Sequence, residues 1–442
     1  MSALDNRSTS RRVLMIRYEG NPFAVRMSKT ILTLLGAGYE IDILVPHGKK
    51  GIATYRSRSG RPLEELVNLS YFETKITFRW RLSNLLDKSR LQRDEAFEAR
   101  LGEILRDRRY DAIVVKDSHK LPAVFRVLEK RGLRETPVVC DMYENATEQT
   151  ADYFIRFASF RRRMLTRLVL AVPRLRESER RYLPRCDRIF VVVEETRRYL
   201  LDRYDLQPER VSVVENVELL EQFDAIETGD AFADHLEPGT RLVSYVGSIG
   251  AHRGIETFLG GIARLTPDQK KNTAFAIVGA REITRERIER MAKNLGIGKE
   301  LRVLGYVSHD DAMRWIKRSQ VGVIPHSDTP FIRTTVPNKL FQYMAAGALV
   351  LSCDVGPLGR IVRETDCGFV FPAHSADALA EKLALALEDD DVIATKGRNG
   401  RAAVDRVYSW EHQGAAYRDY FESLTRGRGQ ARSATVPKEA VL

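Results

Sequence analysis

The residues best suited to chemistry lie in one stretch of the chain, residues 334–356, which read TTVPNKLFQYMAAGALVLSCDVG. This stretch places a lysine among hydroxyl and amide side chains at the expected start of a helix, where backbone N–H groups and the helix dipole attract negative charge. A functional site is therefore expected here. The side chains available for contacts are those of Thr334, Thr335, Asn338, Lys339 and Gln342.

A second cation follows a loop that is rich in glycine. The mostly apolar residues 242–246 predict a strand. Gly247, Gly250 and Gly254 punctuate the loop after it, and a helix is expected to begin at its end. Backbone N–H groups at a helix start, together with a neighbouring cation, form an anion site. Arg253 is therefore the best candidate for a phosphate ligand, because one guanidinium can donate to two phosphate oxygens.

The stretch 334–356 reads as a helix followed by a strand. Pro337 cannot lie inside a helix, so a helix is expected over residues 338–346, with Gly347 as its stop. The apolar run 348–353 is typical of a strand buried in a parallel sheet, and a Gly-Pro turn follows it. These elements are half of a doubly wound α/β domain, whose ligands bind at strand and helix ends.

The first half of the chain shows the same alternation. Strands are expected at residues 12–16, 39–46, 111–115 and 137–141, and a helix at 24–37. Gly20 lies in the first loop, and polar clusters follow the two later strands, at the edge where parallel sheets collect ligands. His119, in the first of these clusters, is a candidate catalytic residue; an ordinary loop histidine is the alternative.

The stretch 334–356 resembles the donor-site segment of family 4 retaining glycosyltransferases of the GT-B fold, which usually reads Pro-Ser/Asn-Lys-Leu-Phe-Glu-Tyr-Met-Ala-Ala-Gly. The segment 243–254 is similar to that family's Val-Gly-Arg...Lys-Gly loop, with Arg253 at the lysine position. The resemblance implies an α/β protein of two Rossmann-like, doubly wound parallel-sheet domains that face each other across a cleft, with a C-terminal helix that crosses back.

The resemblance also implies roles for individual residues. Arg253 and Lys339 would hold the departing diphosphate of a nucleotide sugar by electrostatics, and with His119 they form the expected catalytic set. The donor contacts that it implies are Gly20, Gly250, Arg253, Tyr306, Thr334, Thr335, Asn338, Lys339 and Gln342.

Among the departures from the family pattern, four bear on activity. Gln342 and Thr334 stand where the family has two Glu residues, and Ser248 stands where it has Arg. Where the family has a pair of glycines in the first loop, this chain has only Gly20. One hypothesis is a transferase that moves a sugar from a nucleotide-diphosphate donor to a hydroxyl acceptor with retention at the anomeric carbon, in polysaccharide or glycolipid biosynthesis. The alternative is a catalytically degenerate GT-B protein that binds a partner or a membrane. A GT-B epimerase or phosphorylase fits less well, because the Pro-Asn-Lys wording is that of transferases.

The expected domain organisation follows from the resemblance and from the composition. It comprises a disordered N-terminus (1–10), an N-terminal acceptor domain (11–223), a linker (224–240), a C-terminal donor domain (241–407), a crossing helix (408–424) and a disordered tail (425–442).

Composition is that of a soluble globular protein, with 43% hydrophobic and 30% charged residues among 442. The formal net charge of +11 favours acidic partners. Nucleic acid is not expected, because the arginines cluster in one segment without a nucleic-acid-binding module around them. The four cysteines have neither disulfide nor metal-ligand spacing, which predicts free thiols in a reducing cytoplasm.

Residues 151–188 interleave apolar side chains with arginines. This pattern is typical of a basic amphipathic helix that can lie on an anionic membrane surface; a packed surface helix is the alternative. No run is long enough to span a bilayer, so the expected location is cytoplasmic, with peripheral attachment to the inner face of the plasma membrane if that helix binds lipid.

The expected partners are a nucleotide-diphosphate sugar and a saccharide or lipid-linked acceptor. No cofactor is expected, because the nucleotide sugar is a co-substrate. No metal is expected either, because no Asp-x-Asp stands at a strand end to bind one.

Overall fold

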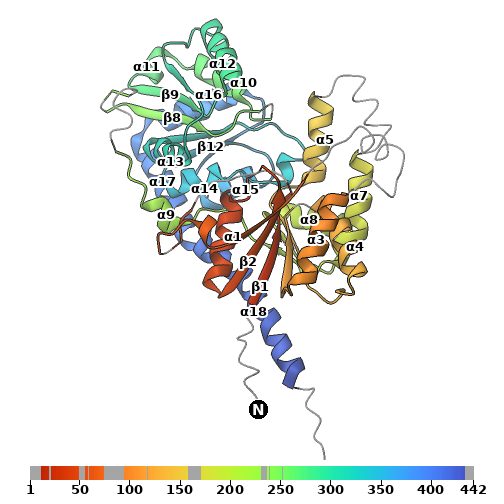
Figure 1. Cartoon of the computed structure of the whole chain (residues 1–442). Coiled ribbons are helices and arrows are strands. Elements are labelled where there is room, and N and C mark those ends of the chain that lie inside the picture. Colours follow the sequence, from red (N-terminus) through yellow and green to blue (C-terminus); the bar gives the residue numbers. More distant parts are fainter. Residues whose placement is uncertain are drawn as a thin grey trace, which may run out of the picture. The chain divides into compact units, whose positions relative to one another are not determined.

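A computed structural model describes residues 11–18, 21–48, 55–57, 59–73, 94–116, 118–157, 171–229, 236–237, 239–250 and 252–433. The chain folds into two compact units, which are visible in Figure 1. Unit 1 consists of Met1–Val192, Arg197–Val214 and Gly414–Leu442, and unit 2 consists of Val193–Thr196 and Glu215–Gln413. The last segment of the chain thus belongs to the same unit as the first.

Within the described residues, unit 1 contains a parallel sheet of seven strands in the order β3-β2-β1-β4-β5-β6-β7. The strands are β1 (Arg11–Ile16), β2 (Tyr39–Pro46), β3 (Asn68–Phe72), β4 (Ala112–Val115), β5 (Val138–Met142), β6 (Arg188–Val191) and β7 (Val211–Val213). β1 pairs in parallel with β2 on one side and with β4 on the other. The strand order therefore reverses between β1 and β4, as in doubly wound folds.

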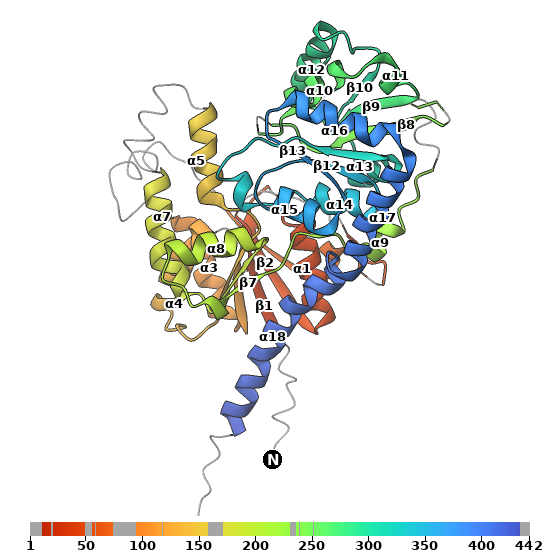
Figure 2. The same ribbon diagram turned by 180° about the vertical axis from the view of Figure 1, so that it is seen from behind.

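Helices cover both sides of this sheet. They are α1 (Val25–Gly36), α3 (Glu95–Asp107), α4 (Leu121–Lys130), α5 (Ala146–Phe157), α7 (Ala171–Tyr182) and α8 (Glu194–Arg203). Figures 1 and 2 show α1 on one side of the strands and α3 and α4 on the other. The continuous apolar strands are buried from both faces, as parallel sheets require.

Unit 2 contains a second parallel sheet, in which six described strands follow the order β10-β9-β8-β11-β12-β13. The strands are β8 (Arg241–Val246), β9 (Thr273–Val278), β10 (Leu301–Leu304), β11 (Val321–Ile324), β12 (Leu349–Cys353) and β13 (Gly368–Phe371). β8 pairs with β9 and with β11, so the order reverses between β8 and β11. The prediction of an α/β fold with two doubly wound parallel sheets is confirmed.

The helices of unit 2 connect or flank these strands along the chain. They are α9 (Leu220–Asp224), α10 (Ile255–Arg264), α11 (Pro267–Lys270), α12 (Glu282–Asn294), α13 (His309–Arg318), α14 (Lys339–Ala345), α15 (Gly356–Thr365), α16 (Ala376–Glu388) and α17 (Asp390–Arg406). The last helix, α18 (Trp410–Ser433), begins in unit 2 and continues in unit 1, where the rings of Tyr417 and Phe190 lie 4.6 Å apart.

Some predicted bounds differ from the structure. α18 extends to Ser433, past the helix end expected at residue 424, and only residues 434–442 of the expected disordered tail lie outside the described residues. Within the segment 151–188, the end of α5 and all of α7 are helical, and residues 158–170 lie outside the described part. The expected disordered N-terminus and residues 230–235 and 238 of the expected linker also lie outside it.

All four cysteines are buried and unpaired, as predicted. In the described part of the chain, no helix is both long enough and apolar enough to cross a lipid bilayer. The same residues contain no group of three or more His, Cys, Asp or Glu side chains arranged to hold a metal ion.

Candidate functional site

The candidate site lies in unit 2, where the strand order of its sheet reverses between β8 and β11. At such a point the loops that leave two neighbouring strands diverge and leave room for a ligand. The loop after β8 carries Arg253, and His326 follows β11 directly after Pro325. α14, which begins with Lys339, contacts the same part of the sheet.

Two glycines give the loop after β8 its shape. Gly247 has a φ of 127°, and a Cβ atom there would lie 3.1 Å from Lys339 Nζ, so glycine permits the close approach of the lysine. Gly254, the N-cap of α10, has a φ of 62°, and a Cβ there would lie 1.6 Å from the carbonyl oxygen of Pro325. The loop is therefore packed against the end of β11.

His326 contacts the first candidate cation. Its side chain is completely buried, and its Nε2 atom lies 2.5 Å from Arg253 Nη1. Burial, followed by the nearby charges of Arg253 and Lys339, holds the pKa of His326 well below its ordinary value. The imidazole is consequently neutral at pH 7, and Nε2 can accept a hydrogen bond from the guanidinium.

α14 is anchored to β8 by Tyr343. The buried Tyr343 hydroxyl donates to the carbonyl oxygen of Ser244 at 2.9 Å and accepts from the backbone N–H of Val246 at 3.0 Å. A Cβ at Gly322 would lie 2.2 Å from the Tyr343 ring, so the absence of a side chain on β11 makes room for this ring. Because Lys339 lies one turn before Tyr343, the anchor places the lysine beside the glycine loop.

Lys339 supplies the second candidate cation. Only 8% of the residue is exposed, and its Nζ atom lies 3.5 Å from the centre of the Tyr245 ring. Among the residues that the structure describes, nothing accepts a hydrogen bond from this nitrogen. Burial, and secondly the charge of Arg253, lower the pKa of Lys339 well below its ordinary value. A buried amine that feels the charge of a guanidinium, with no carboxylate pairing it among the described residues, is an environment suited to an anion.

Gln342 is paired with a carboxylate that the sequence did not bring to attention. Its Nε2 atom donates to Glu218 Oε1 at 2.7 Å, and both side chains are buried. Glu218 lies between β7 and α9, and its backbone carbonyl accepts from the N–H of Trp410. Gln342 is thus hydrogen-bonded to a carboxylate that another segment of unit 2 contributes.

The other site residues predicted in the stretch 334–356 are Thr334, Thr335 and Asn338. Thr334 is buried, and its hydroxyl lies 3.0 Å from the carbonyl oxygen of Pro330 and 3.1 Å from that of Phe331. Its own carbonyl accepts from the hydroxyl of Thr196. Thr335 is also buried, whereas Asn338 is half-buried and its side chain does not cap α14.

Two predicted contacts lie on the surface of unit 2. Tyr306 follows β10 and is 89% exposed. Gly250 is exposed, and a Cβ there would meet nothing within 4 Å. Its carbonyl oxygen accepts from the N–H of Arg253 at 3.1 Å, which closes the turn before the arginine.

His119 belongs to unit 1, in the short 3-10 helix Ser118–Lys120 after β4. Its ring lies edge-on to that of Tyr18, with the ring centres 5.8 Å apart. Gly20 and Asp117 lie outside the described residues. The structure therefore places Arg253, Lys339 and Gln342 in unit 2 and His119 in unit 1.

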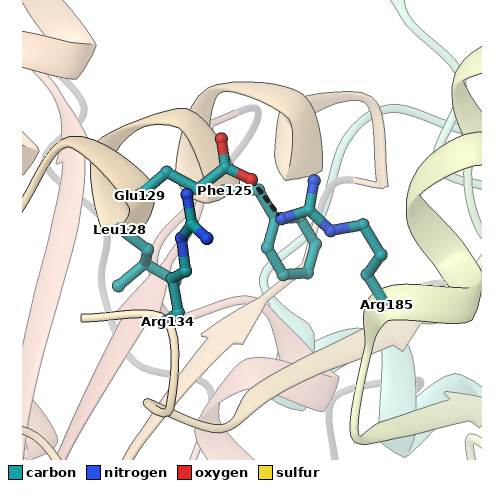
Figure 3. A pocket seen from close by; sticks show the side chains of 5 residues that line it. All are labelled: Phe125, Leu128, Glu129, Arg134 and Arg185. Carbon is teal, nitrogen blue, oxygen red and sulfur yellow. Dashed lines mark hydrogen bonds and ion pairs between the residues drawn. The ribbon is translucent and has the colours of Figure 1, made fainter. Parts of the chain in front are cut away.

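A separate hollow of about 280 Å³ lies on unit 1. Figure 3 shows its lining residues, Phe125, Leu128, Glu129, Arg134 and Arg185. Arg185 is 2.6 Å from the carboxylate of Glu129 and lies over the Phe125 ring at 4.2 Å. None of the predicted site residues lines this hollow, so we assign it no part in the candidate site.

Comparison with known proteins gives two family matches. The family described as "Glycosyl transferase 4-like domain" matches residues 24–217, and that described as "Glycosyl transferases group 1" matches residues 229–403. A curated relative, D-inositol 3-phosphate glycosyltransferase of Corynebacterium glutamicum, is 26% identical over 242 residues, which are 52% of this chain and 56% of that protein. The chain thus spans about half the length of the curated relatives that it matches.

Solved structures resemble nearly the whole chain. Sucrose-phosphate synthase from Thermosynechococcus elongatus has a TM-score of 0.71 at 18% identity, covering 94% of this chain and 100% of that one. HepE from Anabaena, solved with UDP-glucose, has a TM-score of 0.66 at 11% identity, covering 93% and 99%. At these identities the likeness shows the fold.

Two doubly wound parallel-sheet units, the second with a glycine loop and two clustered basic side chains at its switch point, define a protein of the GT-B class. Since the two family matches cover most of both units, the chain belongs to the group 1 glycosyltransferases, that is, to family 4 of the GT-B type.

Proposed function

We propose that the protein transfers a sugar from a nucleotide-diphosphate donor to a hydroxyl group of a saccharide or lipid-linked acceptor, with retention at the anomeric carbon. The observation that carries the proposal is the buried Lys339 amine, which lacks a hydrogen-bond acceptor among the described residues and lies against the glycine loop that bears Arg253. Family membership and the complex of HepE with UDP-glucose support this choice of donor.

In this proposal, Arg253 and Lys339 stabilise the charge that develops on the diphosphate as the bond to the sugar breaks. Electrostatic stabilisation of this kind needs no metal ion or other cofactor, because the protein's own cations supply the positive charge. Removal of one such contact typically costs on the order of 3 kcal/mol, or about a hundredfold in rate. We place the reaction in polysaccharide or glycolipid biosynthesis at the cytoplasmic side of the membrane.

A second function is favoured by the surroundings of two residues. Thr334 and Gln342 carry no carboxylate at positions where the family usually has one. The Thr334 hydroxyl lies close to two backbone carbonyls, and the Gln342 amide is paired with Glu218. A degenerate GT-B protein that binds a nucleotide sugar without turnover would show this pattern. Release of free nucleotide from a nucleotide sugar distinguishes the two functions.

The test is a thermal-shift and calorimetric screen against UDP, GDP, ADP and TDP, with wild type and Arg253→Ala in parallel. A nucleotide that binds only the folded protein raises the melting temperature. We expect one base to stabilise the wild type, and we expect Arg253→Ala to lose most of that shift. Arg287→Ala is the matched control, because Arg287 lies on the surface of the same unit, paired with Glu256.

The outcomes separate the hypotheses. Stabilisation together with turnover supports the transferase, and stabilisation without release of nucleotide supports the degenerate protein. If none of the four nucleotides binds at millimolar concentration, the donor site proposed here is wrong.

A further inference from the structure

The inference concerns the protonation of Lys339 and rests on the proposed function. A protonated amine forms up to three hydrogen bonds in water, and burial removes them. At this position the described residues offer the nitrogen no acceptor, only the face of the Tyr245 ring at 3.5 Å. An aromatic face attracts a cation, but it replaces none of the hydrogen bonds that water provided.

The neighbouring groups add repulsion. Arg253 contributes a positive charge from the loop after β8, and His326, after β11, is fully buried. His252 lies in the same loop, Tyr245 on β8 and the buried thiol of Cys353 on β12. At the far end of α14, Arg401 of α17 donates to the carbonyl oxygen of Ala345. Among the described residues, no carboxylate pairs with Lys339 to favour its charged form.

We propose that Lys339 is a neutral amine in the ligand-free protein and takes up one proton from solvent when the donor diphosphate binds. The amine becomes an ammonium group, and the charge that it gains is balanced by the incoming phosphate oxygens. In the empty site, the neutral amine avoids an unpaired buried charge. In the occupied site, the protonated amine donates charge-assisted hydrogen bonds to the phosphate oxygens.

Proton uptake on binding predicts a pH dependence with a definite sign. Between the pKa of the free site and that of the occupied site, binding consumes one proton, so affinity falls as pH rises. The limiting slope is about tenfold in Kd for each pH unit. Nucleotide sugars are suitable probes because their diphosphate carries no group that titrates near neutral pH.

The experiment is calorimetric titration of the full chain with UDP-glucose, GDP-mannose, ADP-glucose and TDP-glucose, at about pH 8 in HEPES and in Tris. The two buffers differ in ionisation enthalpy, so the difference between the observed heats gives the number of protons taken up. For the sugar nucleotide that binds, we expect close to one proton with the wild type, and a Kd that rises up to about tenfold for each pH unit.

Two substitutions identify the group that titrates. Lys339→Arg keeps a cation whose charge is permanent, so we expect binding with no proton uptake and a flat pH profile. Lys339→Met keeps most of the length of the side chain but removes the amine, so we expect weaker binding, again without proton uptake. Uptake that persists in Lys339→Met would assign the proton to His326 or His252 and overturn the inference.

The inference and the proposed function fail in different ways. If no nucleotide sugar binds, the proposed donor site is wrong and the inference falls with it. If one binds and the heats in HEPES and in Tris agree, Lys339 is already protonated in the free protein, and the inference alone is wrong.

Discussion

At the scale of single residues, the departure of Gln342 from the family pattern has a physical reason in this chain. The side-chain amide donates to Glu218 at a site where both residues are buried. An amide suits this position because it can donate to one neighbour and accept from another, whereas a carboxylate can only accept. The pair therefore keeps one carboxylate at this place without placing two negative charges in contact.

A prediction at this scale tests the pair of Gln342 and Glu218. Gln342→Glu, which restores the usual family residue, should destabilise the protein by about 3 kcal/mol, because it opposes two buried carboxyl groups. The double variant Gln342→Glu with Glu218→Gln exchanges the two groups and should recover most of the loss. The measurement is the midpoint of urea unfolding at neutral pH. A single variant as stable as wild type would show that the 2.7 Å contact is unimportant.

The sequence led to the two cations of the candidate site but not to the groups that contact them. Arg253 and Lys339 belong to continuous segments with recognisable spacing. His326 follows a predicted strand, and from the sequence alone a structural and a functional role for it are equally open. Glu218 gives no signal of its own, since its partner at position 342 is distant in sequence and their contact depends on tertiary packing.

At the scale of elements, most of the strands were predictable and the exact helix ends were not. β2 was predicted at residues 39–46 and is observed as Tyr39–Pro46, because a continuous apolar run is typical of a buried parallel strand. β3 was not predicted, because Asn68–Phe72 is short and mostly half-buried, without a continuous apolar run. The helix expected over residues 338–346 is α14, which ends, as predicted, before Gly347 at a φ of 70°.

The element-scale prediction concerns the turn that starts α10. Gly254→Ala should destabilise the protein by about 3 kcal/mol or more, because the backbone is left-handed there and the new Cβ would meet the carbonyl oxygen of Pro325. Gly250→Ala is the matched control in the same loop, since its Cβ would meet nothing within 4 Å. Thermal unfolding of both variants provides the measurement, and equal losses would contradict this account of the turn.

At the scale of the whole molecule, the chain leaves unit 1 after Val214 and re-enters it at Gly414. The residues of unit 2 at these two crossings are bonded to each other. The backbone N–H of Glu215 donates to Gln413 Oε1, and Gln413 Nε2 donates to Glu215 Oε2, both at 3.2 Å. These hydrogen bonds join two segments of unit 2 that are far apart in sequence, at the points where the chain passes between the units.

The carboxyl group of Glu215 makes this pair of hydrogen bonds sensitive to pH. Burial raises the pKa of its carboxyl group from an ordinary 4.5 to about 7, despite the opposing effect of Arg360. Glu195 and Glu364, which bind Arg360 at 2.7 and 2.9 Å, raise it further. The folded protein thus retains a proton that the unfolded chain releases, so its stability falls as pH rises from about 4.5 to 7.

The final prediction follows from this fall in stability with rising pH. A shift of this size corresponds to a loss on the order of 3 kcal/mol above pH 7. Glu215→Gln keeps an acceptor for Gln413 and cannot ionise, so the variant should be more stable than wild type at alkaline pH, and this advantage should shrink as pH falls. Urea unfolding at several pH values measures both effects, with Glu286→Gln on the surface of α12 as the control. A stability difference that does not change with pH would mean that Glu215 is ionised throughout, and that the link between the two crossings does not depend on its proton.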